Sequence, residues 1–362
     1  MARRLGVELP LIQGPLNGLN TQRLTAAVSN HGGLGSFGAH GLAANAIAEA
    51  IAEIRSLTDK PFAVNLWVSM DDLQGRGSDE AAFHRGLKSV AASITALGGT
   101  LPTYEPYRAL RFEDQVRVVL DAKVPVFSFI CGIPPKEILE ECRRQNILIM
   151  GTATTVDEAR ELEQSGVDLI VASGQEAGGH RGSFLRRAED SPVGTFALVP
   201  QVTDAVSLPV IAAGGIADAR GVLAALALGA EGVLLGTAFV ASPLSGAGAA
   251  YRATLLQRRA SHTALTRNFT GRLARGVDNE LMALLNQPDI QVLPYPLQRH
   301  LVRHITDAAQ RANRPDLAIF WAGQSADLIR SDDATGLIDQ LMSSVAGLAG
   351  AMLAFGQARR GQ

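Results

Sequence analysis

The sequence predicts an α/β protein, a (β/α)8 TIM barrel with a smaller, mainly helical second domain. From residue 11 to about residue 237, short apolar runs alternate with longer helical patterns, and Gly, Pro or Asn marks each change. About eight such runs fall within roughly the 250 residues that are typical of this barrel. After Thr237 the alternation stops, which indicates a different architecture for the rest of the chain.

The strand candidates are nearly continuous apolar runs, as is typical of parallel strands with both faces covered. Helical patterns separate them, for example at Leu42–Leu57, Thr155–Gln164 and Asp218–Leu228. This order indicates βα units around a parallel sheet. The candidates are Leu11–Gln13, Leu34–Ser36, Phe62–Trp67, Pro125–Phe129, Ile147–Met150, Leu169–Ala172, Val210–Ala213 and Gly232–Leu235.

We divide the chain into three segments. Residues 1–240 form the barrel, residues 241–325 form a mainly helical substrate or lid domain, and residues 326–362 form a C-terminal helix that returns to the barrel. Within the second segment, Ser242–Ala260 has a helical pattern, whereas Gly271–Asn279 is expected to be a loop.

Charge and cysteine content exclude several classes of protein. With 33 Lys and Arg against 35 Asp and Glu, the chain has no basic surplus for nucleic acid or an anionic membrane. Cys131 and Cys142 are the only cysteines, and their spacing predicts neither a disulfide framework nor a metal site. The N-terminus lacks a signal-peptide core, and polar residues interrupt the apolar stretch Leu337–Phe355. We therefore expect a cytoplasmic protein.

Glycines follow the last two predicted strands of the barrel. Gly214 and Gly215 follow one strand, and Leu235, Gly236 and Thr237 end and follow the next. In barrels of this kind these two loops commonly bind phosphate. Glycine lets backbone N–H groups approach an anion closely. The pair predicts a phosphate cradle, although each loop is also compatible with a simple tight turn.

A glycine-rich segment from Ser173 to Gly182 follows the sixth predicted strand and carries a single histidine, His180. Catalytic groups of such barrels lie at the ends of strands, and histidine titrates near neutral pH. His180 is therefore our candidate general base or substrate ligand. The other six histidines lack this position, and any one histidine is more often structural or solvated.

Two further strand ends are candidates for contacts with a cofactor. Asn65 lies near the end of the third predicted strand, although an Asn that caps a strand end is also ordinary. Gln13 to Leu16 end the first strand and could line a planar ring. Gly33 to Gly38 match the dinucleotide motif GxGxxG, but a helical pattern precedes them instead of a strand, so we reject that interpretation.

Taken in order, these motifs resemble those of the nitronate monooxygenase family, formerly called 2-nitropropane dioxygenases. The resemblance covers about residues 10 to 240 and continues in two later segments. The motifs are Gln13-Gly14-Pro15-Leu16, Ser29-Asn30-His31-Gly32-Gly33-Leu34-Gly35, Glu176-Ala177-Gly178-Gly179-His180-Arg181-Gly182, Ala213-Gly214-Gly215-Ile216, Gly236-Thr237, Thr270-Gly271-Arg272 and Trp321-Ala322-Gly323-Gln324.

The resemblance implies an FMN-dependent flavoprotein that oxidises small alkyl nitronates, or nitroalkanes, with O2 to carbonyl compounds and nitrite. It implies that His180 serves the substrate, and Tyr295 begins a segment that surrounds the substrate in one branch of the family. No metal is implied. The cofactor set that we predict is Gln13, Gly14, Pro15, Leu16, Asn65, Ser173, Gly178, Gly179, Gly214, Gly215, Leu235, Gly236 and Thr237.

The chain departs from the family pattern at several positions. Ser173 replaces a flavin-contacting Gln, and Leu234 stands where a polar residue or Met is common. Arg299 and Arg303 stand where a further Tyr and a Lys are expected. Two alternatives stay open: an FMN-dependent NAD(P)H enoyl-thioester or quinone reductase, and a barrel that binds FMN or another phosphate ligand without turnover. Apolar positions in the second domain are compatible with a homodimer.

Overall fold

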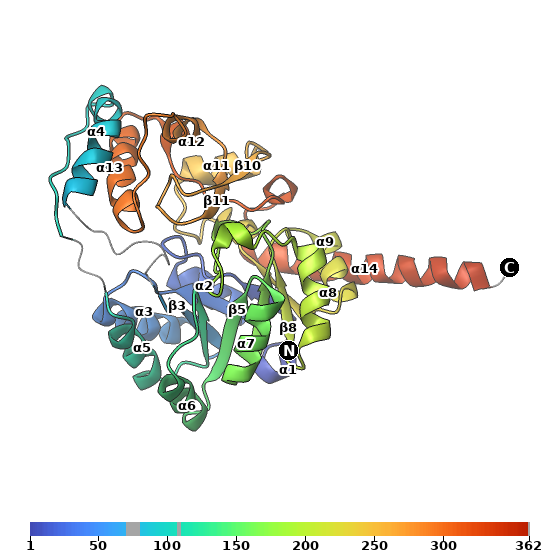
Figure 1. Cartoon of the computed structure of the whole chain (residues 1–362). Coiled ribbons are helices and arrows are strands. Elements are labelled where there is room, and N and C mark those ends of the chain that lie inside the picture. Colours follow the sequence, from blue (N-terminus) through green and yellow to red (C-terminus); the bar gives the residue numbers. More distant parts are fainter. Residues whose placement is uncertain (70–79, 107–109, 361–362) are drawn as a thin grey trace.

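The computed structural model describes residues 1–69, 80–106 and 110–360, with the side chains of residues 352–360 excepted. It contains an eight-stranded parallel sheet that curls into a nearly closed barrel (Figure 1). The predicted (β/α)8 fold is confirmed. The strands, in their order around the barrel, are β1 (Leu11–Gln13), β9 (Gly232–Leu235), β8 (Val210–Ala213), β6 (Leu169–Ser173), β5 (Leu148–Ala153), β4 (Val126–Ile130), β3 (Phe62–Trp67) and β2 (Gly35–Gly38).

Amphipathic helices pack around the barrel and bury their apolar faces against the outer side of the strands. Short polar side chains begin several of them: Thr21, Thr155 and Asp218 each accept a hydrogen bond from a backbone N–H group of the first turn. The helices are α2 (Gln22–Asn30), α3 (Ala44–Leu57), α5 (Phe112–Asp121), α6 (Lys136–Arg144), α7 (Val156–Ser165), α8 (Thr195–Ala205) and α9 (Ala219–Ala227), with the short α1 (Ala2–Leu5) before β1.

The GxGxxG segment has a packing role at the start of β2. A Cβ atom on Gly35 would lie 2.0 Å from the carbonyl oxygen of Thr25 in α2, so only glycine permits this approach of helix and strand. Helix α2 ends at Asn30, so a helix and not a strand precedes the motif, as we expected when we rejected the dinucleotide interpretation.

The seam between β1 and β2 is joined by a side chain. Only one backbone bridge, Ile12 to Leu34, connects these strands. Beside it, the Gln13 amide accepts from Ser36 N and donates to Ser36 O, both at 3.1 Å, and it also donates to Gly14 O. The Gln13 amide thus continues the ladder in the way that a peptide group would. Gln13 is fully buried on the outer side of β1, because its neighbour Ile12 points into the barrel.

A second hydrophobic core lies above the barrel. Phe83 and Ile94 of α4 (Glu80–Ala96) pack there with residues of α12 (Glu280–Leu285) and α13 (Leu297–Arg311), and Figure 1 shows α4 and α13 side by side. Helix α4 lies in the stretch 1–240 that we assigned to the barrel, so that assignment is wrong for this helix. The chain leaves the barrel after β3 and returns at α5, and helical periodicity alone does not reveal which core an amphipathic helix joins.

The second domain also contains a small antiparallel sheet. Strand β11 (Ala274–Val277) pairs with β10 (Thr263–Thr266) and with β7 (Gly179–His180). The expectation of a loop at Gly271–Asn279 is therefore wrong. The glycines and arginines of this segment do not show strand alternation, and the strand forms because two distant segments pair with it. The helical pattern of Ser242–Ala260 forms α11 (Ala249–Leu256), after the short α10 (Thr237–Val240).

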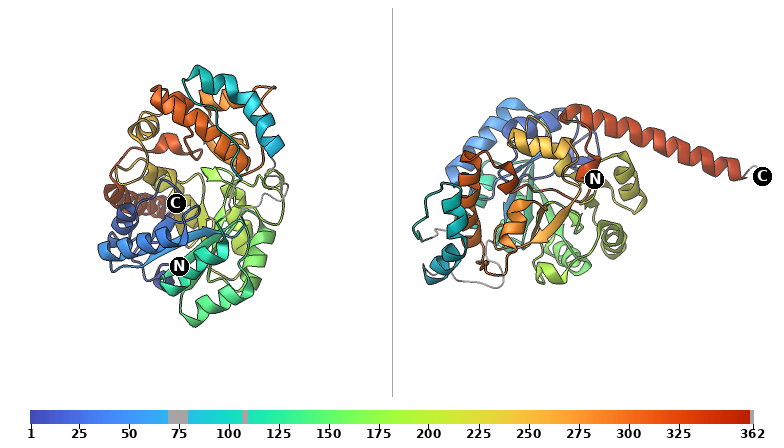
Figure 2. Two further views of the ribbon diagram at one scale, coloured as in Figure 1. Left: turned by 90° about the vertical axis from the view of Figure 1, so that its left-hand side faces the viewer. Right: turned by 90° about the horizontal axis from the view of Figure 1, so that it is seen from above.

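The C-terminal helix α14 (Ala334–Arg360) completes the outer ring. Its first turns bury Leu337, Ile338 and Leu341 against α9 and α2. The predicted return to the barrel is correct for this part only. Beyond Val345 the helix projects from the molecule, as Figure 2 shows. Among the described residues, no helix is long and apolar enough to cross a membrane.

We predict that Gln13→Ala lowers the free energy of unfolding by about 2 kcal/mol or more, because the buried N–H and C=O of Ser36 lose their partners. The measurement is urea denaturation with the full chain. Gln201→Ala is the control, because Gln201 is exposed and bonds only within α8. Equal denaturation midpoints for the two variants would contradict the role of Gln13 in the seam.

Candidate active site

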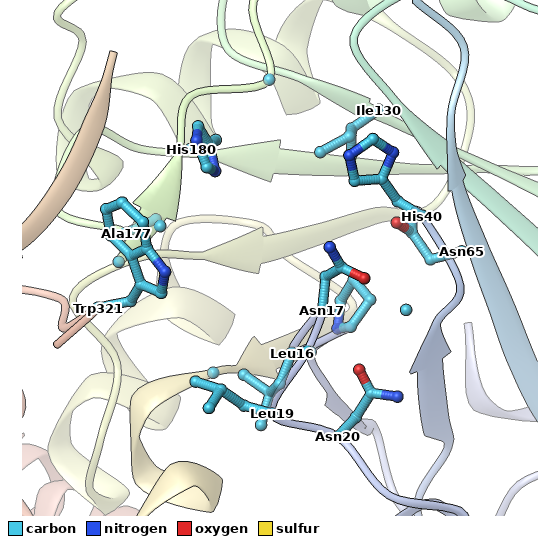
Figure 3. A pocket seen from close by; sticks show the side chains of 18 of the residues that line it. Leu16, Asn17, Leu19, Asn20, His40, Asn65, Ile130, Ala177, His180 and Trp321 are labelled. Carbon is cyan, nitrogen blue, oxygen red and sulfur yellow. The ribbon is translucent and has the colours of Figure 1, made fainter. Parts of the chain in front are cut away.

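A cavity of about 1050 Å³ opens at the C-terminal ends of the barrel strands. This is the end of the barrel where enzymes of this fold carry their chemistry. Loops after β1, β2, β6, β8 and β9 form its floor, and Tyr295, Arg299 and Trp321 from the second domain cover it. The cavity therefore lies between the two hydrophobic cores, and Figure 3 shows part of its lining.

The two glycine loops that we predict to bind phosphate come together on one side of the cavity. Gly214 and Gly215 have φ values of +98° and +72°, a backbone conformation that side chains with Cβ disfavour. A Cβ atom on Gly214 would also lie 3.0 Å from Ala177 N. Gly236 and Thr237 line the cavity beside them. Two glycine loops on neighbouring strands thus turn their backbones towards the same space.

Two charged side chains, the partly buried Glu176 and the buried Arg181, hold the glycine-rich segment after β6. Glu176 accepts hydrogen bonds from the N–H and the hydroxyl of Thr195 at 2.9 Å, which ties the segment to the start of α8. Arg181 donates to Ser173 O and Gly174 O at 3.1 and 2.6 Å. Burial lowers the pKa of Arg181 to about 10, so this side chain remains a cation at neutral pH. The glycine-rich segment is therefore fixed by charged side chains despite its composition.

His180 lies on β7 among aromatic rings. Its ring centroid is 5.0 Å from that of Trp67, 5.1 Å from that of Trp321 and 6.0 Å from that of Tyr295. Its Nε2 is 2.8 Å from the Thr270 hydroxyl. Pairing of β7 with β11 sets this position, because His180 lies opposite Ala274 in the register.

A second histidine, His40, follows β2 and lines the same cavity. Its ring stacks on Trp67 with a centroid separation of 3.9 Å and an interplanar angle of 8°. Its Nε2 is 3.0 Å from the Tyr295 hydroxyl. Trp67 thus contacts both cavity histidines, and Figure 3 shows His40 and His180 at two sides of the pocket.

Two arginines make this end of the cavity electropositive. The Arg272 guanidinium lies 5.3 Å from the centroid of the Trp67 ring, and Arg299 lines the cavity. Burial, followed by the charges of Arg299 and Arg272, lowers the pKa of His40 to about 3. Burial and the same two arginines, with Arg272 the stronger, hold the pKa of His180 well below 6.5. Both imidazoles are therefore neutral at pH 7, and an anion would be attracted to the site.

The structure brings most of the predicted site residues to this cavity. His180 and Tyr295 line it together with eleven of the thirteen predicted cofactor residues, which are Gly14, Pro15, Leu16, Asn65, Ser173, Gly178, Gly179, Gly214, Gly215, Gly236 and Thr237. Gln13 and Leu235 do not line the cavity, because their side chains are buried on the outer side of the barrel. Three positions at which the chain departs from the family pattern also line the cavity: Leu234, Arg299 and Arg303.

Sequence reasoning missed several side chains of the site. His40 follows a strand end, the criterion that selected His180, so a consistent use of that criterion would have found it. Trp67 is the last residue of a predicted strand, and nothing in the sequence singles out its ring. Thr270, Arg272 and Trp321 belong to motifs of the second domain to which we gave no site role. Only the tertiary fold places Thr270 and Trp321 against His180, and Arg272 against Trp67.

We predict that His40→Asn makes the protein less sensitive to acid. An unfolded histidine has a pKa near 6.5, whereas folding lowers that of His40 to about 3, so the unfolded state binds more protons between these values. Above pH 6.5 neither state binds this proton, and the free energy of unfolding is unaffected. As the pH falls below 6.5, protonation of the unfolded state lowers the free energy of unfolding. Between pH 7 and pH 5, we expect the free energy of unfolding, measured by urea denaturation, to fall by about 2 kcal/mol more in the wild type than in the variant. Equal losses would contradict the prediction.

The chain was compared with known proteins. The family model described as nitronate monooxygenase matches residues 1–344. A probable nitronate monooxygenase of Staphylococcus haemolyticus is 37% identical over 351 residues, which cover 95% of this chain and 96% of that protein. One from Staphylococcus aureus (strain MSSA476) is 38% identical over 350 residues, with the same coverage of both chains.

Solved structures give the same result. A crystal structure of a nitroalkane oxidase from Streptomyces ansochromogenes superposes with a TM-score of 0.87 and 33% identity, and the match covers 97% of this chain and 100% of that one. FabK from Thermotoga maritima superposes with a TM-score of 0.73 and 28% identity over 98% of both chains. The match of family model, relatives and fold along nearly the whole sequence shows that the chain belongs to the nitronate monooxygenase family of flavin-dependent oxidoreductases.

Proposed function

We propose that this protein binds FMN and oxidises small alkyl nitronates with O2 to carbonyl compounds and nitrite. The observation that carries the proposal is the presence, in one cavity, of a glycine cradle and of a neutral histidine beside two arginines. The cradle suits the phosphate of a mononucleotide, and the histidine with its arginines suits a small anion.

The residues on the cradle side fit a flavin mononucleotide. The open backbone at Gly214, Gly215, Gly236 and Thr237 would hold the phosphate. On the loop after β1, the buried Asn20 Oδ1 lines the cavity and has no hydrogen-bond partner among the described residues, so it suits a ribityl hydroxyl or a ring N–H group. When bound, the flavin accepts electrons from the substrate and passes them to O2.

Thr270 is the hydrogen-bond partner of His180. Its Oγ1 lies 2.8 Å from His180 Nε2 and 3.2 Å from Arg272 O. When its one proton goes to Arg272 O, it accepts from His180 Nε2–H, and the neutral imidazole then has an unprotonated Nδ1 that can act as a general base. When its proton goes to Nε2, the imidazole proton lies on Nδ1, which can then donate to an oxygen of a substrate.

The electrostatics favour a nitronate over a neutral nitroalkane. A pKa well below 6.5 makes His180 a weak base, which is poorly matched to removing a proton from carbon. The arginine charges that lower this pKa also stabilise an anion. A nitronate arrives already deprotonated and needs only to be bound and oriented.

One experiment distinguishes this proposal from the reductase alternative. The structural similarity to FabK is the reason to test that alternative. The absorbance of the purified protein is recorded without oxygen, after addition of propane-2-nitronate to one sample and of NADH to another. We expect flavin bleaching by the nitronate only, followed by nitrite release in air. Bleaching by NADH alone would overturn the proposal in favour of a reductase.

We predict that His180→Asn lowers kcat/KM for propane-2-nitronate by about tenfold, because the imidazole that orients the bound nitronate is lost. Nitrite release measures the rate, and absorbance checks that the flavin stays bound. His84→Asn is the control, since His84 is exposed on α4 and does not line the cavity. A rate within threefold of the wild type would remove His180 from catalysis.

We predict that Gly215→Ala weakens FMN binding about tenfold or more, because a Cβ atom strains a backbone with a φ of +72° in the cradle. Gly98→Ala is matched to it, with a φ of +71° and a position outside the cavity. Flavin content after dialysis gives the measurement. Equal flavin loss from both variants would show that the strain acts on overall stability and not on the cradle.

A further inference from the structure

Trp321 presents an unused hydrogen-bond donor to the cavity. Its indole N–H group can only donate, so this character depends neither on a tautomer nor on pH. Trp321 lines the cavity, and within the described part of the chain its Nε1–H group has no hydrogen-bond partner. Unlike the enclosed Nδ1 of His40, it is not one of the buried atoms that lack a partner, so it is open to the cavity. Figure 3 shows the ring nitrogen of Trp321 on the side that faces the pocket.

The indole ring is held in place from several sides. The Tyr251 hydroxyl donates to the carbonyl oxygen of Trp321, and a backbone bridge joins Trp321 to Gly276 of β11. The Phe269 ring meets the indole edge to face, with 5.7 Å between the ring centroids and an interplanar angle of 73°. A Cβ atom on Gly276 would lie 3.5 Å from Cε3 of the indole, so the ring rests directly on this strand. The donor is therefore oriented before a ligand binds, which lowers the entropy cost of binding.

The backbone after Trp321 is bonded to the glycine loops. Gly323 N–H donates to Thr237 Oγ1 at 3.0 Å. Gln324 N–H donates to Glu176 O at 2.9 Å. These bonds fix the segment beside the loops after β9 and β6, and the indole extends from there towards the electropositive end of the cavity.

His180 is the neighbour that indicates the ligand of this donor. Its ring centroid lies 5.1 Å from that of Trp321, with an interplanar angle of 49°, and both rings line the cavity. A small ligand that contacts His180 is therefore also beside the indole. Arg299 lines the same cavity and adds positive charge. A free N–H group close to a cation suits an oxygen of an anion, because hydrogen bonds to ionised acceptors are the stronger ones.

We propose that Trp321 is a substrate-binding residue whose Nε1–H donates to an oxygen of the nitronate group. The arginine charge attracts the anion, and the fixed N–H group orients it. The identity of the substrate rests on the function proposed above. The existence of the donor does not, because an anion of the same shape can occupy the site without turnover.

The first test uses isobutyrate, a carboxylate with the same planar pair of oxygens as propane-2-nitronate and no path to oxidation. The chain has only two tryptophans, so full-length protein with nitrogen-labelled tryptophan gives two indole signals in NMR, and Trp321→Phe assigns them. Spectra are recorded with and without FMN. We expect isobutyrate to move the Trp321 indole proton downfield in the flavin-loaded protein, with the affinity that calorimetry measures.

The second test removes the donor and keeps the ring. Benzothienylalanine, which has a sulfur atom in place of the indole N–H group, replaces Trp321 site-specifically. We expect about tenfold weaker isobutyrate binding and a similar rise in KM for the nitronate, at an unchanged melting temperature. The control carries benzothienylalanine in place of Phe196, which is exposed on α8 and does not line the cavity. Its isobutyrate affinity should lie within about twofold of the wild type.

A Trp321 indole signal that does not move with isobutyrate would overturn the proposal, as would unchanged isobutyrate affinity after the replacement of Trp321. A signal that FMN alone moves, and that isobutyrate leaves in place, would assign the donor to the flavin instead.

The two proposals fail separately. If isobutyrate binding depends on the Trp321 N–H group but no nitronate is oxidised, the anion site stands and the proposed function fails. If nitronate is oxidised with an unchanged KM after the replacement of Trp321, the function stands and the role of Trp321 fails.

Discussion

Positive charge without a matching carboxylate governs the substrate end of this cavity. Arg272 and Arg299 surround two buried imidazoles and a phenol, and in the described part of the chain neither arginine forms an ion pair. Burial is the largest cause of the low pKa of both histidines, and the two arginine charges add to it, so each neutral imidazole has one donor nitrogen and one acceptor nitrogen. Thr270 is the partner of His180 Nε2, and Tyr295 is the partner of His40 Nε2. Burial and the two arginines together thus keep this end of the cavity positive while its imidazoles are neutral.

The two ends of the cavity use different means to attract negative charge. The cradle after β8 and β9 exposes backbone N–H groups of glycine loops, which suit a fixed group such as a phosphate. The other end uses Arg299 of α13 and Arg272 of the segment before β11, both from the second domain. Changes in the second domain can therefore alter one end of the cavity while the glycine loops at the other end stay intact.

Much of the barrel could be predicted from the sequence, because parallel strands are short apolar runs and glycines mark their ends. The meeting of the two glycine loops in one cavity could be predicted from their positions after neighbouring strands. We expected Gln13 to contact the cofactor, but its side chain is buried against Ser36 on the outer side of β1. The motif that contains Gln13 does not reveal the direction in which the side chain points. Strand β11 and the packing of α4 depend on partners far along the chain, which no local pattern reveals. Thr270, which bonds His180, and Arg272, which lies over Trp67, belong to a family motif, but no site role could be given to them for the same reason.

The place of α14 in the ring of helices has a consequence for biosynthesis. Its first turns cover α9 and α2, which are elements from opposite ends of the barrel sequence. On the ribosome these two helices are made well before Leu337 and Leu341 emerge, and chains are extended at about 5 to 20 residues per second. For that interval the nascent barrel keeps an apolar strip open to solvent. Chaperones that bind exposed apolar surface would meet the chain at this strip until translation brings the last helix into place.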